Sequence, residues 1–287
     1  MNMSRGGLRF CLLCFAAGCG TQENVSPLAP PDLSTSIVAE ARLPSTEGQA
    51  TSPDLKLADA DYRLLFVGNS HTAMHELPLL VRKMIEHLHP GKTVMTNYIP
   101  CAFLEDAANN PACISEIKTR PWKHVILQAQ KISMSGKFAY SRKEGIELAK
   151  LAKVHGATAV YYPEWGLKGV AGDGERQLKV YVEMAKESGA SVAPVSRAWD
   201  LALEKQPKLE LHSPDGNHQS AVGAFLTACV LYGQITGESP LALAKYPYAS
   251  ANEATRKFLV EQADAALREQ KEKAEKGKDK APAPKSP

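Results

Sequence analysis

The sequence predicts an α/β fold, a three-layer α/β/α sandwich around a central, mostly parallel sheet of about five strands. Three observations predict it. About 210 residues remain between a polar leading segment and a polar tail, which is ample for one domain with a substantial core. Short apolar runs alternate with longer helical patterns, as in βαβ units. Residues 64–67 are continuously apolar, which is typical of a strand buried on both faces.

The first residues have the features of an export signal. Arg5 and Arg9 precede an apolar run, and small residues then lead to Cys19. The apolar run is too short to cross a bilayer as a helix. Residues 16–19 look like a lipoprotein cleavage box, so we expect residues 1–19 to be a signal with Cys19 as the lipidated residue. An ordinary signal peptide cut nearby is the alternative. Either predicts export, and lipidation predicts a bacterial membrane anchor facing the periplasm or cell exterior.

Two segments lack the pattern of a packed core. Residues 20–58 are rich in Pro, Ser and Thr with no sustained period, so we expect a flexible tether there. Residues 269–287 contain alternating Lys and Glu and then Ala-Pro repeats, which predicts a disordered charged tail. The predicted folded domain therefore spans residues 59–268.

Strand and helix signals follow in order within that domain. The predicted strands are five short apolar runs, at residues 62–67, 93–99, 124–130, 158–163 and 191–195. The predicted helices have apolar residues at helical spacing, at residues 76–88, 142–154, 175–187, 197–204, 218–235 and 252–270. Their alternation places helices on both faces of a parallel sheet.

Charge and motifs narrow the function. The formal net charge of +3 is small for 287 residues and argues against a nucleic-acid partner. The glycines at residues 169–174 follow no strand directly and lack the ending of a phosphate loop. We expect no metal and no cofactor.

Ser70 stands where a nucleophile would be useful. The first strand ends in Gly68-Asn69-Ser70, and ligands in open α/β sheets bind beyond the carboxyl ends of strands. A serine here could equally cap a helix. The second signal is Asp215-Gly216-Asn217-His218, which precedes an apolar helix. Here His218 could remove the Ser70 proton while Asp215 orients the imidazole.

These two blocks resemble those of the SGNH (GDSL-type) hydrolases. Residues 68–72, Gly-Asn-Ser-His-Thr, are similar to the first block of that family, and residues 215–218 to its last. Residues 223–232 and 236–240 are similar to a bacterial branch that includes lipoproteins. The resemblance covers roughly residues 60–245. It implies a flavodoxin-like SGNH hydrolase fold, with Ser70, Asp215 and His218 as the catalytic triad.

The middle blocks depart from that family. The resemblance implies an oxyanion hole built from the backbone N–H of Ser70, a backbone N–H after the second strand, and a side-chain amide after the third. Cys101 stands where the family has glycine, and Gln130 where it has asparagine. Gln128 is the rival amide, and Gln128 and Gln130 could also be ordinary polar residues at a strand end. Asn69 and Gln128 are candidate substrate contacts.

Other residues near the predicted site have two interpretations. Trp165 follows the fourth strand and suits stacking on a sugar or acyl group, although a core or loop anchor is the alternative. We expect His71 to lie beside the site, because adjacent residues on such a turn point apart. Cys101 and Cys113 are a candidate disulfide in an oxidising compartment, and Cys229 is predicted to be a small buried hydrophobe.

Together these features predict an exported serine esterase. It would hydrolyse carboxylic esters through an acyl-enzyme, and the absence of a long apolar lid favours short acyl groups, such as acetyl, on carbohydrate. We expect a monomer whose partners are an ester substrate and, through its lipid, a membrane. The alternative is a lipid-tethered carbohydrate-binding or scaffold protein with an inactive SGNH fold, motivated by Cys101 and Gln130.

Overall fold

A computed structural model describes residues 56–278, so the predicted signal, Cys19, nearly all of the tether and the last residues of the tail lie outside the described residues. The described chain forms one five-stranded sheet in the order β2-β1-β3-β4-β5, with every neighbouring pair parallel. The strands are β1 Tyr62–Gly68, β2 Val94–Pro100, β3 His124–Leu127, β4 Thr158–Tyr161 and β5 Ser191–Val192. The predicted fold class is confirmed.

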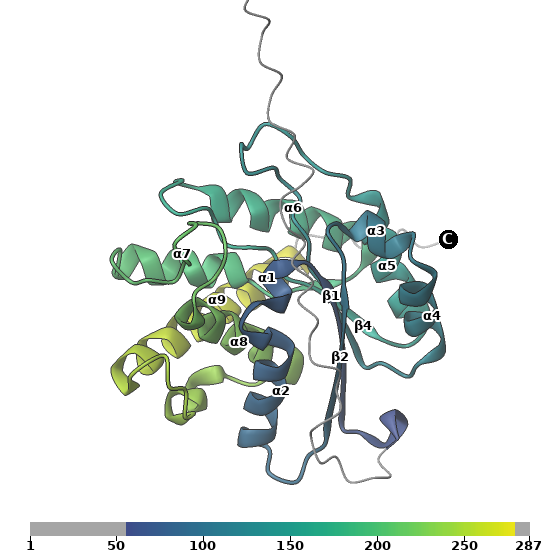
Figure 1. The fold of residues 1–287 in the computed structure, drawn as a ribbon, viewed down its shortest axis with the longest axis horizontal. Helices are drawn as coiled ribbons and strands as arrows, with labels where there is room; N and C mark the ends of the chain where they lie inside the picture. The colour runs from purple at the N-terminus through teal and green to yellow at the C-terminus, as the bar shows by residue number, and fades with distance from the viewer. Residues whose placement is uncertain (1–55, 279–287) are drawn as a thin grey trace, which may run out of the picture. The chain divides into compact units, whose positions relative to one another are not determined.

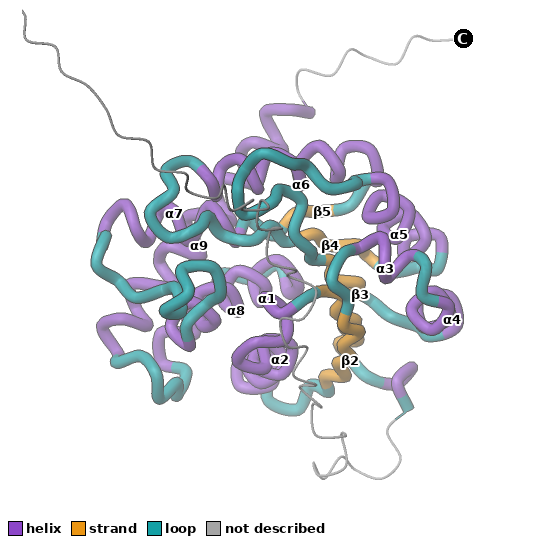
Figure 2. Tube along the Cα trace, turned by 45° about the horizontal axis from the view of Figure 1, so that its top comes forward, coloured by secondary structure: helices purple, strands orange, loops and turns teal. Residues whose placement is uncertain are grey.

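Strand β1 shows how the sequence builds the layers. Its residues alternate between the two faces: Leu64 and Phe66 pack in one hydrophobic cluster, and Leu65 and Val67 pack in the other. A strand with both faces buried must be apolar throughout, which explains its continuous apolar run. The same division places helices on both sides of the sheet, which Figures 1 and 2 show from two directions.

The helices divide between the two faces. One face is covered by α2, α7, α8 and α9, and the other by α3, α4, α5 and α6. Their bounds are α1 Ser70–Ala73, α2 Leu77–Leu88, α3 Leu104–Ala108, α4 Pro111–Thr119, α5 Lys143–Val154, α6 Asp173–Ser188, α7 Val195–Lys205, α8 Ala221–Thr236 and α9 Glu253–Lys278, with short 3-10 turns at Leu57–Asp59, Met74–Glu76 and Pro240–Lys245.

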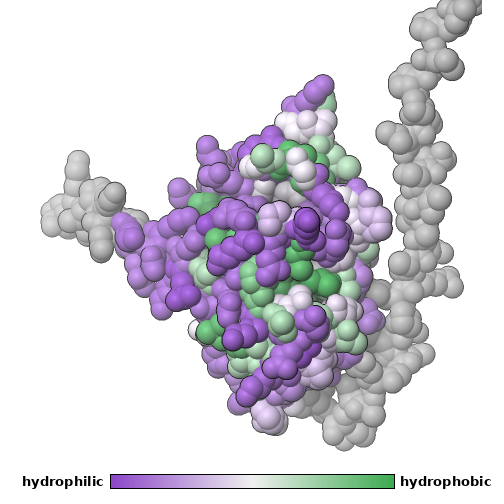
Figure 3. Space-filling model, turned by 90° about the vertical axis from the view of Figure 1, so that its left-hand side faces the viewer, coloured by the Kyte–Doolittle hydropathy of each residue, from purple (hydrophilic) through white to green (hydrophobic). Residues whose placement is uncertain are grey.

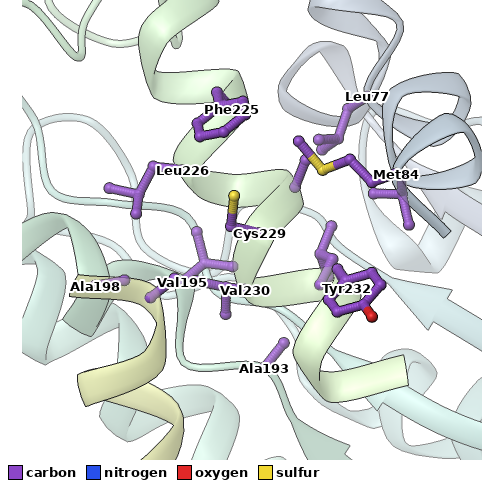
Figure 4. Close-up of a cluster of buried hydrophobic side chains, with 14 of the residues drawn as sticks. Leu77, Met84, Ala193, Val195, Ala198, Phe225, Leu226, Cys229, Val230 and Tyr232 are labelled. Carbon is purple, nitrogen blue, oxygen red and sulfur yellow. The ribbon is translucent and has the colours of Figure 1, made fainter. Parts of the chain in front are cut away.

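Helix α8 is the centre of the larger core. It is apolar on nearly all sides and is enclosed by α2, α7 and α9, as a helix without a polar face must be. Figure 4 shows Cys229 on this helix, among apolar side chains of the same cluster. Burial raises the pKa of the Cys229 thiol well above its usual value, so the prediction of a small buried hydrophobe is confirmed.

The surface on the α7 and α9 side is mostly hydrophilic, with apolar residues gathered near its middle (Figure 3). Helix α9 continues to Lys278, so the predicted boundary at residue 268 falls inside a helix. Within residues 56–278, no helix is both long and apolar enough to cross a bilayer.

Three strands are shorter than predicted, and β4 ends at Tyr161 rather than at residue 163. Strand β3 ends at Leu127, although the sequence predicted residues 124–130, and β5 covers only Ser191–Val192. After Leu127 the Gln128 N–H still donates to the carbonyl of Val67, but the Ala129 N–H turns to the Tyr181 hydroxyl. The alternation of a strand therefore stops before Gln130, and this changes which amide can reach the site.

Candidate active site

The strand order brings three carboxyl ends together at one edge. Gly68 of β1 pairs with Pro100 of β2, and Val67 pairs with Leu127 of β3. The chain leaves β1 toward β2 on one side and leaves β3 toward β4 on the other side, so the two connections run in opposite directions along the sheet. Ligands in open α/β sheets bind at such a topological switch point.

Ser70 lies at this switch point. Asn69 caps helix α1, since its Oδ1 accepts from the His71 N–H at 3.0 Å. Ser70 is the first residue of that helix and is exposed. The first N–H groups of a helix have no partner within it, and the Ser70 N–H forms no hydrogen bond within the described residues.

Ser70, His218 and Asp215 form a chain of hydrogen bonds. Ser70 Oγ lies 2.8 Å from His218 Nε2, and His218 Nδ1 lies 2.5 Å from Asp215 Oδ2. The Asp215 Oδ1 accepts from the backbone N–H groups of Asn217 and His218, both at 2.9 Å. The hydrogen bond from His218, followed by these backbone bonds, lowers the pKa of Asp215 to about 2. Asp215 is therefore ionised at neutral pH and holds the imidazole with Nε2 toward Ser70.

The loop that carries Asp215 and His218 is fixed by a residue that the sequence analysis missed. Gln219 is buried, and its Nε2 donates to the carbonyls of His71 and Met74, each at 3.1 Å. These bonds tie the loop directly to the turn after β1. A glutamine next to a candidate histidine carries no recognisable motif, so only the fold reveals its role.

The other two histidines near the cleft also support this loop. His75 Nε2 lies 3.1 Å from the Gln219 carbonyl, and His212 Nε2 lies 2.8 Å from the Gly166 carbonyl. Both imidazoles thus contact backbone rather than open space.

His71 stacks on His218, and Trp165 packs against the His71 ring at a tilt. The His71 ring lies 4.8 Å from the His218 ring, and 5.2 Å from the Trp165 ring. Trp165 stacks on Trp199 at 4.1 Å, and its Nε1 donates to the Asn217 carbonyl. Trp165 is only 3% exposed, so it is the loop anchor of the two alternatives and not a substrate contact.

His71 is closer to the site than expected. Its ring does not point away from the Ser70 side of the turn but supports the imidazole of His218. Burial, followed by the nearby His218, lowers the pKa of His71 to about 4, so it is neutral at physiological pH.

Two predicted oxyanion donors are engaged elsewhere. The Cys101 N–H donates to the Gly68 carbonyl at 2.9 Å, completing the ladder between β1 and β2. The Gln130 Nε2 donates to the Ile132 carbonyl at 2.8 Å, because the chain turns after Leu127. The Cys101 assignment is therefore wrong, because its single N–H is already used. The Gln130 amide keeps a second hydrogen, but Gln130 is not among the residues that line the pocket beside Ser70.

A small pocket beside Ser70 offers a different donor. It is lined by Asn69, Ser70, Tyr98, Pro100, Cys101 and Ala102. The Ala102 N–H follows the last ladder bond, and no hydrogen bond from it is formed within the described residues. Ala102 is exposed. Of the predicted contacts, Asn69 lines this pocket, whereas Gln128 is fully buried beneath it and cannot reach a substrate.

Cys101 and Cys113 are free thiols rather than the predicted disulfide. Cys113 lies on α4 with its side chain in the core between that helix and the sheet, while Cys101 lies at the pocket. Burial raises the pKa of the Cys101 thiol to about 12, so it is not a thiolate nucleophile. In the part of the chain that the structure describes, His, Cys, Asp and Glu side chains form no cluster able to hold a metal ion.

Comparisons with known proteins show similarity in fold to solved structures. No protein-family model and no curated protein matches the chain. Among solved structures it is similar to one described as a candidate SGNH hydrolase from Slackia heliotrinireducens, at 22% identity and a TM-score of 0.50, over 61% of this chain and 99% of that one. It is also similar to a DUF4886 family protein from Bacteroides uniformis, at 14% identity and a TM-score of 0.53, over 72% and 95% of the two chains.

Proposed function

With the fold of the SGNH hydrolases as the premise, we propose that this chain is a serine hydrolase of carboxylic esters. One observation carries the proposal. Ser70, His218 and Asp215 form an unbroken chain of hydrogen bonds at the switch point of the sheet, with Ser70 exposed beside a pocket. A histidine that contacts both a serine hydroxyl and an ionised aspartate is the arrangement that activates a weak nucleophile.

The reaction follows from these contacts. Ser70 Oγ attacks the acyl carbonyl carbon as His218 Nε2 takes its proton, and the negative charge of Asp215 stabilises the imidazolium. His218 then returns the proton to the departing alcohol, which leaves an acyl-Ser70 ester. Water, deprotonated by His218, attacks this ester and releases the acid and the free Ser70.

The oxyanion of each tetrahedral intermediate would be met by the N–H groups of Ser70 and Ala102. Both lie at the pocket, and the bond between the Cys101 N–H and Gly68 holds the β2 end in place while leaving the next N–H available. Donors fixed in advance of the reaction are the ones that stabilise developing charge most.

We propose short acyl groups, such as acetyl, on carbohydrate as the substrate. Tyr98 and Pro100 line the pocket beside Ser70, where they would contact a small acyl group. The predicted signal and Cys19 support an exported lipoprotein anchored in a bacterial membrane. Release of acetate from a panel of acetylated glycans would test the substrate class, and release only from simple lipid esters would refute it.

A fluorophosphonate probe tests the nucleophile. The folded protein is expected to be labelled at Ser70, and Ser70→Ala is expected to lose labelling and to lower kcat for p-nitrophenyl acetate by about 10⁴–10⁶. Ser115→Ala is the matched control, the same change at an exposed serine on α4. Equal turnover by wild type and Ser70→Ala would contradict the proposal.

A second candidate function is a lipid-tethered carbohydrate-binding or scaffold protein with an inactive fold. The observation in its favour is that the Cys101 N–H and the Gln130 amide, two of the three expected donors, make other bonds. The exposed Ser70–His218 pair favours the enzyme. Glycan binding by both wild type and Ser70→Ala, without turnover by either, would support the binding protein.

A further inference from the structure

Gln128 lies directly beneath the turn that carries Ser70. It follows the last residue of β3, and its side chain is fully buried. Its Oε1 accepts from the Asn69 N–H at 3.2 Å and from the Thr72 hydroxyl at 2.7 Å, and its Nε2 donates to Glu164 Oε1 at 2.8 Å. One amide therefore holds the residue before Ser70 and the second residue after it.

The fit around this amide is close. A Cβ on Gly68 would lie 2.2 Å from Thr72 Oγ1 and 2.8 Å from Gln128 Oε1, so only glycine leaves room for the contact. Thr72 Oγ1 also lies 2.5 Å from the Tyr162 hydroxyl. Thr72, Gln128 and Tyr162 thus form a buried polar network against the turn, with no solvent to replace a lost bond.

The direction of the Gln128 amide is decided by Glu164. An amide can turn over and exchange its oxygen with its NH₂ group. In the reversed orientation, the NH₂ group would face the Asn69 N–H, and the oxygen would face the Glu164 carboxylate. Glu164 comes after β4 and is 4% exposed, so it is an acceptor that water cannot replace. It therefore selects the orientation in which the amide oxygen faces the nucleophile turn.

We propose that Glu164 and Gln128 are positioning residues, a buried carboxylate–amide pair that fixes the turn around Ser70 and so aims its hydroxyl at His218. This inference rests on the proposed function for its kinetic consequence. The pair touches no substrate, since it lies below the pocket, and it acts through the Asn69 N–H and the Thr72 hydroxyl.

The surroundings of Glu164 are consistent with this role. Lys131 from the loop after β3, Tyr162 from the first position after β4 and Tyr181 from α6 are the titratable groups that act on it. Burial raises its pKa to about 7, although its own backbone N–H, the Gln128 amide and the Lys131 charge all lower it. Its Oε2 has no hydrogen-bond partner among residues 56–278. A buried carboxyl group with one free oxygen is costly to the fold, which is typical of a functional constraint.

An exchange of the two side chains tests the pair. Gln128→Glu places two carboxyl groups against each other and removes the hydrogen bond between them. We expect kcat for p-nitrophenyl acetate to fall at least about tenfold, the effect of losing one buried hydrogen bond, with KM nearly unchanged. Glu164→Gln keeps an acceptor and should lose less. The double variant Gln128→Glu, Glu164→Gln restores one carboxylate and one amide, and should recover kcat to within about threefold of wild type.

The readouts separate positioning from stability. Labelling of Ser70 by fluorophosphonate should follow kcat across the series, and Gln262→Glu is the control, the same change at a buried glutamine on α9. A double variant no more active than Gln128→Glu would overturn the proposal, since a role in folding alone gives no such rescue.

A second comparison stands if Gln128→Glu fails to fold. Glu164→Gln and Glu164→Met have similar volumes, but only the first can accept from Gln128, so kcat of the Met variant should be about tenfold lower. Equal values would overturn the proposal. The NMR shift of the Asn69 amide proton should move with Glu164→Met and not with Glu164→Gln. This signal needs no catalysis, so it remains informative if the wild type proves inactive and the proposed function fails.

Discussion

At the scale of single residues, the buried His71 behind His218 makes the stability of the fold depend on pH. His71 lies between His218 and Trp165, and its pKa is lowered to about 4 by burial. An unfolded histidine binds its proton near pH 6.5. Between these values the unfolded chain holds more protons than the folded one, so stability rises with pH in this window and falls as pH drops.

This gives a prediction for His71→Phe. The wild type should lose stability as pH falls from 6.5 to 4, and His71 should account for up to about 3 kcal/mol of that loss. Phenylalanine keeps an aromatic ring and has no proton to bind, so its stability should fall less over the same window. Urea unfolding at pH 7.5 and pH 4.5 measures the difference. Parallel losses in the two proteins would contradict it.

A second prediction separates the two glutamines after β3. Gln130→Ala should leave kcat within about threefold of wild type, because the Gln130 amide bonds the Ile132 carbonyl. Gln128→Ala should lower kcat by tenfold or more, since it leaves the Asn69 N–H without its acceptor and leaves the Thr72 hydroxyl with Tyr162 alone. Steady-state kinetics on both variants decide between them, and a loss of about 10²–10³ for Gln130→Ala would return it to the oxyanion hole.

The glutamines also show where sequence reasoning ended. The positions of Ser70, Asp215 and His218 could be read from two short blocks, because local turns and caps fix those residues. The donors of the oxyanion hole could not be assigned from such short blocks. Gln130 follows from extending β3 by three residues, and that extension fails because the Ala129 N–H bonds Tyr181, which is distant in the sequence.

At the scale of elements, the strand β1 and the turn after it depend on Gly68. Gly68→Ala should destabilise the protein by about 1–3 kcal/mol, because its Cβ would overlap Thr72 Oγ1. Fluorophosphonate labelling should fall more than stability does. Gly68→Ala with Thr72→Ala removes the nearest overlap and should recover part of the melting temperature but not the labelling, since the Thr72 bond to Gln128 is gone. Recovery of both would contradict this account.

The element boundaries were predictable where apolar periodicity is long. Helices α2, α5 and α8 match their predicted ranges closely, because each carries several turns of apolar residues. Helices α3 and α4 were missed. Both helices are short, Asn109 and Asn110 separate them, and α4 begins at Pro111. Residues 101–119 therefore have the composition of a loop. Their apolar side chains are fixed by packing on the sheet rather than by local pattern.

At the scale of the whole molecule, we propose that Cys19, which lies outside the described range, determines where the protein is located. Cys19→Ser should move the protein from the membrane fraction to the soluble fraction without lowering its esterase activity, because lipid is the predicted anchor. Roughly 40 residues of flexible tether would give a reach on the order of 35 Å. Fractionation with activity assays on each fraction measures this, and continued membrane retention would mean that the signal or the basic tail is the anchor.

The bond between Ser70 and His218 joins residues 148 positions apart in the chain. A chain that ends before His218 contains the proposed nucleophile but not the proposed base, so we expect a truncated product to have no esterase activity at all. For the same reason, a covalent probe would label Ser70 only in completely folded molecules. The rate at which labelling returns during refolding would therefore report how fast the contact between Ser70 and His218 forms.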